Sequence, residues 1–275
     1  MPESLGFHRF YIRGDLKAYT ALHIGAGDTD FAPGALDNGV LRDSQGRFFI
    51  PGSSLKGVLR AYVESYAQTQ GQGKGNCCIQ GECAAKAGID KKDKRDQFRR
   101  EIREKYRQKN SKEPSDQEVE AELARQIQSK LCPVCRLFGS PVKAGQLKIR
   151  DAYPTTDPYQ TELRPHVSID RETRTNVSGR FYKDEVIPAD TVFAFSAVLH
   201  QPDEDVLQYV ALWVEALRNE ELTVGGMSSR GLGVVVLENL RVKYQGGLNQ
   251  GSEWKDCNGD LLKYLQDCLS ERMDG

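Results

Sequence analysis

The sequence lacks an apolar run long enough to cross a membrane. Its longest purely apolar stretches, such as residues 234–237, fall far short of the roughly 18 residues that a transmembrane helix needs. Residues 1–4 also show no basic segment leading into an apolar one, which would indicate a secretory signal. We therefore expect a cytoplasmic protein that does not contact a membrane.

A strong excess of charge is absent as well. The 275 residues include 38 Lys and Arg against 39 Asp and Glu, so the formal net charge is -1. The molecule as a whole is therefore not a polycation that coats nucleic acid nonspecifically, and any site for anions must be local. Hydrophobic residues make up 39% of the chain, too many for a disordered protein, and the length suits one elaborated domain or two small ones.

Common catalytic motifs are missing too. The chain has no GxSxG, HExxH or Walker GxxxxGK[ST] spacing, so a serine hydrolase, a zinc protease of that type and a P-loop nucleotide hydrolase are not indicated. The four histidines, which form no metal-binding spacing, are His8, His23, His166 and His200. We expect each of them to be a packed or surface residue.

Cysteine is present in an odd number, and five of the seven cysteines lie between positions 77 and 135. Without an export signal this clustering favours metal ligation over disulfides. Cys132 and Cys135 have the CxxC spacing that directs two sulfurs to one ion. The expected ligands of a structural Zn²⁺ are Cys83, Cys132, Cys135 and one of Cys77 or Cys78. The alternative is that some of these residues are simply buried thiols.

Strand and helix patterns alternate along the rest of the chain. They predict a strand or hairpin within 10–24, short strands at 40–42 and 48–50, a serine-capped helix over 55–63, strands at 147–150 and 191–199, a helix over 206–217, a strand at 234–242 and a closing helix from about 260. This order predicts an α+β fold in which two helices cover one face of a small sheet, the split βαβ layout.

A polar insertion interrupts this alternation. A linker without apolar side chains leads into two charged helices, the second announced by a capping box at Ser115 and Glu118. Their apolar stripes are too narrow for a core of their own, so we expect the insertion to lean on the main body or on the metal. The expected parts are the first half of the core at 1–67, the insertion at 68–145, the second half of the core at 146–243 with an exposed arm or hairpin at 161–185, and a helical tail at 244–275.

Two glycine-containing segments carry basic residues. Residues 51–57 place backbone N–H groups, hydroxyls and Lys56 at a helix start, and residues 225–233 place Arg230 among glycines and serines. Each segment alone could be only a helix cap or a turn. Together they favour binding of a nucleic-acid backbone.

Six motifs occur in the order that is typical of the RAMP superfamily. They are residues 23–27, 34–38, 50–57, 135–139, 146–151 and 225–233. The chain resembles this superfamily over about residues 7–243 and, more narrowly, the backbone subunit of type III CRISPR effector complexes of the Csm-like kind. The middle of the insertion, about 84–130, and the tail after 244 lie outside the resemblance.

The resemblance implies a modified ferredoxin-like or RNA-recognition-motif core with a thumb hairpin and a helical, zinc-stapled insertion. It implies copies stacked along a CRISPR RNA together with further subunits of the effector complex, and target RNA that is cut with Mg²⁺ or a similar divalent ion. The loop aspartate that matches the cleavage residue is Asp37, whereas Asp28 and Asp30 do not match. The residues that we expect to bind RNA are Ser53, Ser54, Lys56, Arg60, Arg171, Arg174 and Arg230.

Two classes of function remain open from the sequence. One is an endoribonuclease subunit, in which Asp37 acts either as a base or as a metal ligand. The other is a catalytically inactive structural subunit that only holds guide RNA and neighbouring subunits. Retention of Asp37 favours the first class. A stand-alone enzyme that processes precursor RNA is disfavoured, because no His or Lys near the first loops offers an obvious acid–base pair.

Overall fold

The structure is a computed structural model of the chain. It describes residues 8–25, 38–69, 77–78, 82–110, 113–157, 159–246, 253–257 and 259–270, with the side chains of 110 and 177–181 left out. Asp37, Asp28 and Asp30 lie outside the described residues. Among the helices of the described part, none is both long and apolar enough to span a bilayer.

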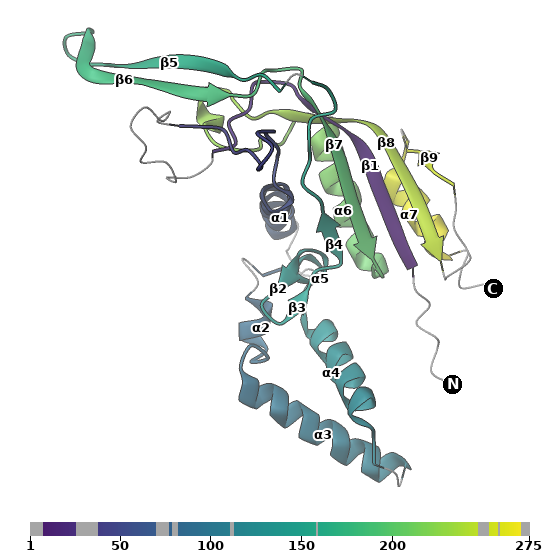
Figure 1. Cartoon of the computed structure of the whole chain (residues 1–275). Helices are drawn as coiled ribbons and strands as arrows, with labels where there is room; N and C mark the ends of the chain where they lie inside the picture. The colour runs from purple at the N-terminus through teal and green to yellow at the C-terminus, as the bar shows by residue number, and fades with distance from the viewer. Residues whose placement is uncertain are drawn as a thin grey trace.

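A five-stranded antiparallel sheet forms the centre of the molecule (Figure 1). Its order in space is β4 (Leu147–Ile149), β7 (Val192–His200), β1 (His8–Ala18), β8 (Val235–Gly246) and β9 (Lys255–Asp256). The short β9 is not part of the core. The other four strands, numbered by their order in the chain, lie side by side as second (β4), third (β7), first (β1) and fourth (β8), which is the arrangement of a ferredoxin-like core. The predicted fold class is therefore confirmed.

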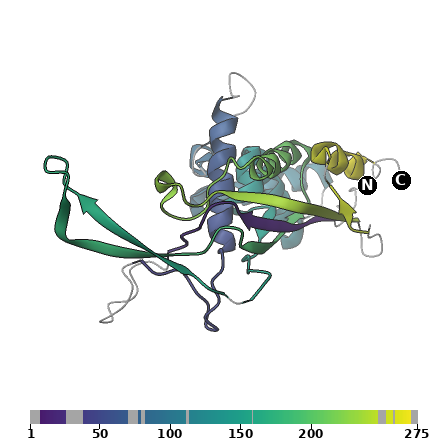
Figure 2. The ribbon, with the colours of Figure 1, turned by 90° about the horizontal axis from the view of Figure 1, so that it is seen from above.

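Two helices of the core continue the predicted alternation. The helices are α1 (Gly52–Thr69), between β1 and β4, and α6 (Glu204–Arg218), between β7 and β8. Their buried stripes repeat every three or four residues, as in Leu55, Leu59 and Val63 of α1. The helix α6 packs on β8, and α7 (Leu261–Ser270) lies beside α6 on the same face of the sheet (Figure 2).

The insertion forms a helical hairpin on the opposite side of the core from the thumb (Figure 1). It contains α2 (Cys83–Lys86), α3 (Lys92–Asn110), α4 (Asp116–Lys130), α5 (Pro133–Phe138) and the small strands β2 (Gly139–Ser140) and β3 (Lys143–Ala144). The predicted capping box is present, with the Ser115 hydroxyl accepting from the Glu118 amide. Buried residues of α3 and α4, such as Ile102 and Leu123, join the same apolar cluster as the sheet, so the insertion leans on the main body as expected.

The thumb is a two-stranded antiparallel hairpin of β5 (Glu162–Ile169) and β6 (Asn176–Val186). It projects away from the central sheet and from the helices (Figure 2). The root of the thumb lies beside the loops that connect β1 to α1 (Figure 1). This matches the exposed arm or hairpin predicted for residues 161–185.

Two local predictions were wrong. The first helix begins at Gly52, so Ser53 lies inside its first turn, and the Asp151 carboxylate caps it by accepting from the Gly52 amide at 2.7 Å. The segments 40–42 and 48–50 form only isolated bridges, not strands. The Asp43 side chain accepts from the amides of Gln45 and Arg47 and closes a tight turn there, which leaves no length for a ladder.

Candidate functional site

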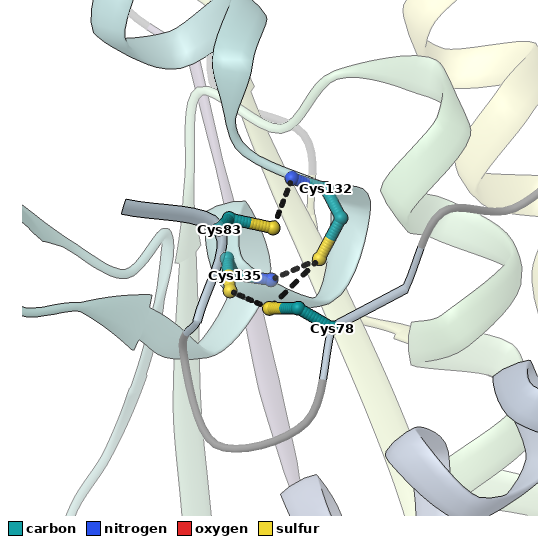
Figure 3. A group of neighbouring side chains, drawn as sticks. All are labelled: Cys78, Cys83, Cys132 and Cys135. Atoms are coloured by element: carbon teal, nitrogen blue, oxygen red, sulfur yellow. Dashed lines mark hydrogen bonds between the residues drawn. The ribbon is translucent and has the colours of Figure 1, made fainter. Parts of the chain in front are cut away.

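Four buried cysteines gather where the insertion joins the core (Figure 3). Cys132 precedes α5 and Cys135 lies in its first turn, while Cys83 begins α2. The fourth residue is Cys78, and the four Sγ atoms all lie within 4.8 Å of one another. Cys77 hydrogen-bonds the Cys78 carbonyl and lies outside this group. Of the two residues that the sequence could not separate, Cys78 is therefore the one in the cluster.

The donor set of this cluster suits a soft divalent ion. The Cys78 sulfur lies 3.8 Å from the Cys132 sulfur and 3.1 Å from the Cys135 sulfur. Zn–S bonds near 2.3 Å in a tetrahedron separate the sulfurs by about 3.8 Å, so a small outward movement of Cys135 would let these sulfurs share one ion. Backbone N–H groups of Cys132 and Cys135 each donate to a sulfur at 3.4 Å, which favours thiolates.

Hydrogen bonding and burial shift the pKa values of the cysteines in this cluster in opposite directions. The hydrogen bond from Cys135 lowers the pKa of Cys132, whereas burial raises the pKa of Cys83 to about 11. The hydrogen bond to Cys132 raises the pKa of Cys135. Four thiolates this close together repel one another, so a metal ion would be needed to hold them together.

The exposed face of α1 carries the first group of predicted RNA contacts. Ser53 and Ser54 are exposed in the first turn, and a Cβ added at Gly57 would meet nothing within 4 Å. Lys56 is half-buried, and burial together with the nearby charges of Arg60 and Lys148 lowers its pKa. No acidic side chain of the described residues contributes to this environment. An anion such as phosphate would relieve that repulsion.

Arg60 differs from the other predicted contacts because it already has protein partners. Its Nε donates to Glu64 at 2.8 Å, and its Nη1 donates to the Gly139 carbonyl at 3.0 Å. The side chain thus ties α1 to the segment after α5. Lys148, on the exposed face of β4, was not predicted but lies beside Lys56.

The predicted thumb residues Arg171 and Arg174 are exposed at the tip of the hairpin. The Asp170 carboxylate accepts from the amides of Glu172 and Thr173 and fixes this turn. Three large apolar side chains of β5 are also exposed, with Leu163 at 52%, Val167 at 53% and Ile169 at 66%. The tip of the thumb therefore offers charge, and one side of its first strand offers apolar surface.

Three separate segments meet at the thumb root around the buried Asp184 of β6. Its carboxylate accepts from the Asn38 side chain at 2.6 Å, and it lies 3.1 Å from His166 Nε2 and 3.6 Å from Arg230. Asn38 belongs to the first loop, His166 to β5 and Arg230 to the glycine-rich loop. Arg230 and Asn38, the residue that directly follows Asp37 in the sequence, thus approach the two oxygens of the same carboxylate.

Glu185 makes a second set of contacts at the same root. Its carboxylate pairs with Arg42 at 2.6 Å and accepts from Thr161 at 2.5 Å and from the Val40 amide at 2.7 Å. These bonds lower the pKa of Glu185 against the opposing effect of burial. The two adjacent acids of β6 thus fix the backbone from position 38 to position 42.

The glycine-rich loop is attached to the root through His23. The His23 ring Nδ1 lies 2.8 Å from the Glu185 carbonyl, and the Gly226 amide donates to the His23 carbonyl at 2.8 Å. Gly225 has a φ of 89°, and a Cβ there would lie 2.3 Å from the same carbonyl, so only glycine fits. The short helical turn that follows, Ser228–Arg230, presents Arg230 half-exposed.

Two curated relatives match nearly the whole chain. The CRISPR system Cms endoribonuclease Csm3 of Methanocaldococcus jannaschii is 24% identical over 279 residues, covering 94% of this chain and 91% of the relative. The protein of the same name from Methanothermobacter thermautotrophicus is 23% identical and covers 85% of both chains. The Mycobacterium tuberculosis protein of that name is 47% identical over a short segment of 58 residues.

The family comparison covers most of the described fold. The RAMP superfamily matches residues 15–236, from the middle of β1 into β8. This range contains the four-cysteine cluster, the α1 face and the thumb root. It also contains β4, β7, α1 and α6 of the ferredoxin-like core and reaches into its strands β1 and β8. The chain therefore belongs to the RAMP superfamily.

Proposed function

We propose that this chain is a backbone subunit of a type III CRISPR effector complex, which binds CRISPR RNA and cuts the target RNA paired to it. Two relatives with coverage of 85% or more are named as CRISPR system endoribonucleases. The observation that carries the proposal is the junction at Asp184, which joins the first loop, the thumb and the glycine-rich loop. From the sequence, the first loop is expected to carry the cleavage residue, and the thumb and the glycine-rich loop are expected to contact RNA.

Guide RNA would bind through its phosphates along α1 and the glycine-rich loop. Lys56 and Lys148 supply charge beside the exposed hydroxyls of Ser53 and Ser54, and Arg230 supplies a second contact at the thumb root. These groups contact phosphates and not base edges, so binding should be independent of guide sequence. The thumb, with Arg171 and Arg174 at its tip, would reach the RNA and the neighbouring copy of the chain.

Cleavage would use Asp37. RNA cuts itself when its 2′-hydroxyl is aligned with the adjacent phosphorus, so distortion of the target at one nucleotide supplies much of the catalysis. The carboxylate would accept the 2′-hydroxyl proton or hold Mg²⁺, which supplies positive charge against the charge that develops on the phosphate. Asn38 is held to Asp184 by its side chain and to the Glu185 amide by its carbonyl, so the chain is fixed immediately after Asp37.

The four-cysteine cluster would hold a structural Zn²⁺. Its ligands would be Cys78, Cys83, Cys132 and Cys135, which join the two ends of the insertion. Such an ion contributes folding free energy and leaves no open position for catalysis. The proposal assigns the metal no part in cutting.

The test of the function is Asp37→Asn in the assembled complex with labelled complementary RNA and Mg²⁺. We expect guide and target binding to be retained, while cutting at this subunit's position falls by about 10²- to 10⁴-fold. Asp30→Asn is the matched control, since Asp30 lies in the same stretch but does not match the motif. Undiminished cutting by Asp37→Asn at saturating Mg²⁺ would place the chain in the class of inactive structural subunits.

A further inference from the structure

His166 and Asp184 form a pair at the thumb root that the proposed function does not use. Asp184 is fully buried, and its Oδ2 lies 3.1 Å from His166 Nε2. The His166 ring stacks on Tyr182, directly opposite on β6, with ring centroids 5.3 Å apart and planes inclined by 16°. About a third of the His166 side chain is exposed, and Nε2 is not part of that exposed surface. Neither Nε2 nor the Asp184 Oδ2 makes a hydrogen bond within the described residues, so the carboxylate lies beside the imidazole as an ion-pair partner and Nδ1 is left for another partner.

The charge balance of this pair depends on Arg230. A buried carboxylate needs a counter-charge, and the basic groups of the described structure whose nitrogens are shown within 4 Å of the Asp184 carboxylate are Arg230 at 3.6 Å and His166 at 3.1 Å. Asn38 donates to the other carboxylate oxygen, and Arg164 stands opposite Asp184 on β5 with its guanidinium 3.8 Å from the Glu162 carboxylate. If a phosphate draws Arg230 toward itself, the His166 ring remains beside the buried Asp184 carboxylate.

The other histidines of the chain are not available for the same role. The His23 ring is 7% exposed and its Nδ1 is used by the Glu185 carbonyl. His8 contacts the Pro202 carbonyl, and His200 ends β7 at the opposite end of that strand from the thumb. Arg230 cannot serve as a proton donor, because a guanidinium keeps its proton in proteins.

We propose that His166 is a second catalytic residue, which protonates the leaving 5′-oxygen of the target RNA, and that Asp184 is its positioning residue. The proposal rests on the proposed function, because it assigns to His166 the acid half of the reaction whose basic half is Asp37. Asp184 accepts a hydrogen bond from Asn38, the residue that follows Asp37 in the sequence.

The step balances in bonds and protons. The 2′-oxygen forms a bond to phosphorus and its proton passes to the base, while the bond from phosphorus to the 5′-oxygen breaks. The 5′-oxygen takes the Nδ1 proton of the imidazolium as it leaves. The products are a 2′,3′-cyclic phosphate and a 5′-hydroxyl, and His166 regains its proton from water. General acid catalysis of this kind contributes about 10²- to 10⁴-fold.

The test compares two target RNAs in single-turnover reactions of the assembled complex. One is the ordinary substrate, and the other carries sulfur in place of the 5′-bridging oxygen at the cut site, a leaving group that needs no proton. We expect His166→Gln to cut the ordinary RNA at least about 100-fold more slowly than the unmodified protein. The sulfur substrate should be cut at nearly the same rate by both. Asp184→Asn should show the same pattern in weaker form.

Equal losses on both substrates would overturn the proposal, because they indicate a purely structural role for His166. An unchanged rate on the ordinary RNA would overturn it as well. His166→Phe keeps the stacking on Tyr182 and serves if His166→Gln fails to assemble, and His200→Gln is the matched control. If the proposed function itself is wrong, Asp37→Asn will cut both substrates at the normal rate, irrespective of the effect of His166→Gln. This outcome differs from a failure of the His166 proposal alone.

Discussion

The Asp151 carboxylate accepts a hydrogen bond from the Gly52 amide at 2.7 Å, although the two residues are 99 positions apart in the chain. A negative charge thus already occupies the N-terminus of α1, where the helix dipole favours an anion. A phosphate at that end would meet repulsion from Asp151. We therefore expect phosphate to bind along the exposed side of α1, near Lys56 and the open surface at Gly57, and not on its first amide.

Two glycines of α1 differ in the space around them, and this difference tests how closely the start of α1 packs against β4. A Cβ at Gly52 would lie 2.5 Å from the Ile149 carbonyl, whereas a Cβ at Gly57 would have free space. We expect Gly52→Ala to lower the free energy of unfolding by about 1–3 kcal/mol through overpacking. Gly57→Ala should raise it by about 0.5–1 kcal/mol, as expected in an exposed helix interior. Denaturant titration of both variants checks this, and equal effects would contradict it.

Lys56→Ala and Lys148→Ala should weaken guide binding for every guide sequence. Each substitution removes a charge from the same patch, so affinity for guide RNA should fall roughly tenfold. The slope of log affinity against log salt concentration should become shallower by the contribution of about one phosphate contact. Lys92→Ala, on the exposed start of α3, is the control. Filter binding with two unrelated guides measures both quantities, and a loss that depends on the guide sequence would contradict the assignment.

The pH dependence of guide binding should reveal Lys56. Burial and the neighbouring Arg60 and Lys148 lower its pKa from the ordinary 10.5. A lysine loses its charge above its pKa, so the contribution of Lys56 disappears at a lower pH than that of a surface lysine. Affinity of the unmodified chain should thus weaken as the pH rises toward that value, and Lys56→Ala should lack this step. A step that persists in Lys56→Ala would assign it to another group.

Removal of one cysteine should separate the two candidates for the fourth zinc ligand. We expect the unmodified chain to carry one zinc by elemental analysis, and Cys78→Ser to lose it and unfold at a lower temperature, because ion binding contributes to folding. Cys77→Ser should keep the metal, since its sulfur lies outside the four-sulfur group. Absence of zinc from the unmodified chain, or its loss only in Cys77→Ser, would refute the ligand set.

At the thumb tip, Arg174→Gly removes the charged side chain of Arg174 while keeping the backbone conformation of the turn, so it tests the role of the charge alone. Arg174 has a φ of 56°, so glycine keeps the turn and relieves about 1 kcal/mol of strain. We expect a folded hairpin but poorer assembly on guide RNA or altered spacing of the cuts. Glu220→Gly relieves a φ of 60° in the turn after α6 and serves as the control. Normal assembly with unchanged cut spacing in Arg174→Gly would exclude a role for this side chain.

Periodicity and turn chemistry sufficed to predict β1, β4, β7 and β8 of the central sheet, the core helices, the helical hairpin of the insertion and the hairpin of the thumb, but not the absence of strands at 40–42 and 48–50. The α3–α4 hairpin is the clearest case, because Ser115 and Glu118 cap their own helix and need no distant partner. The start of α1 was misplaced for the opposite reason. Its cap is Asp151, which follows a strand 99 residues away and has no local signature.

The thumb root could not be predicted from the residue pattern. Asp184 and Glu185 stand in a charged stretch of sequence, where acids are usually solvated, yet here both are buried. Their partners Asn38, Arg42 and Arg230 come from two distant loops. His166 was expected to be a packed or surface residue, and only the pairing of β5 with β6 places it beside Asp184.

The apolar side of β5 has a consequence for the protein outside its complex. Leu163, Val167 and Ile169 occupy alternate positions of a two-stranded ribbon, so their exposed surfaces share one side. Water-exposed ribbons of this kind associate with one another when nothing covers them. The solubility of the free chain should therefore fall with its concentration, and cells that make more of this subunit than of its guide RNA would accumulate it as aggregates.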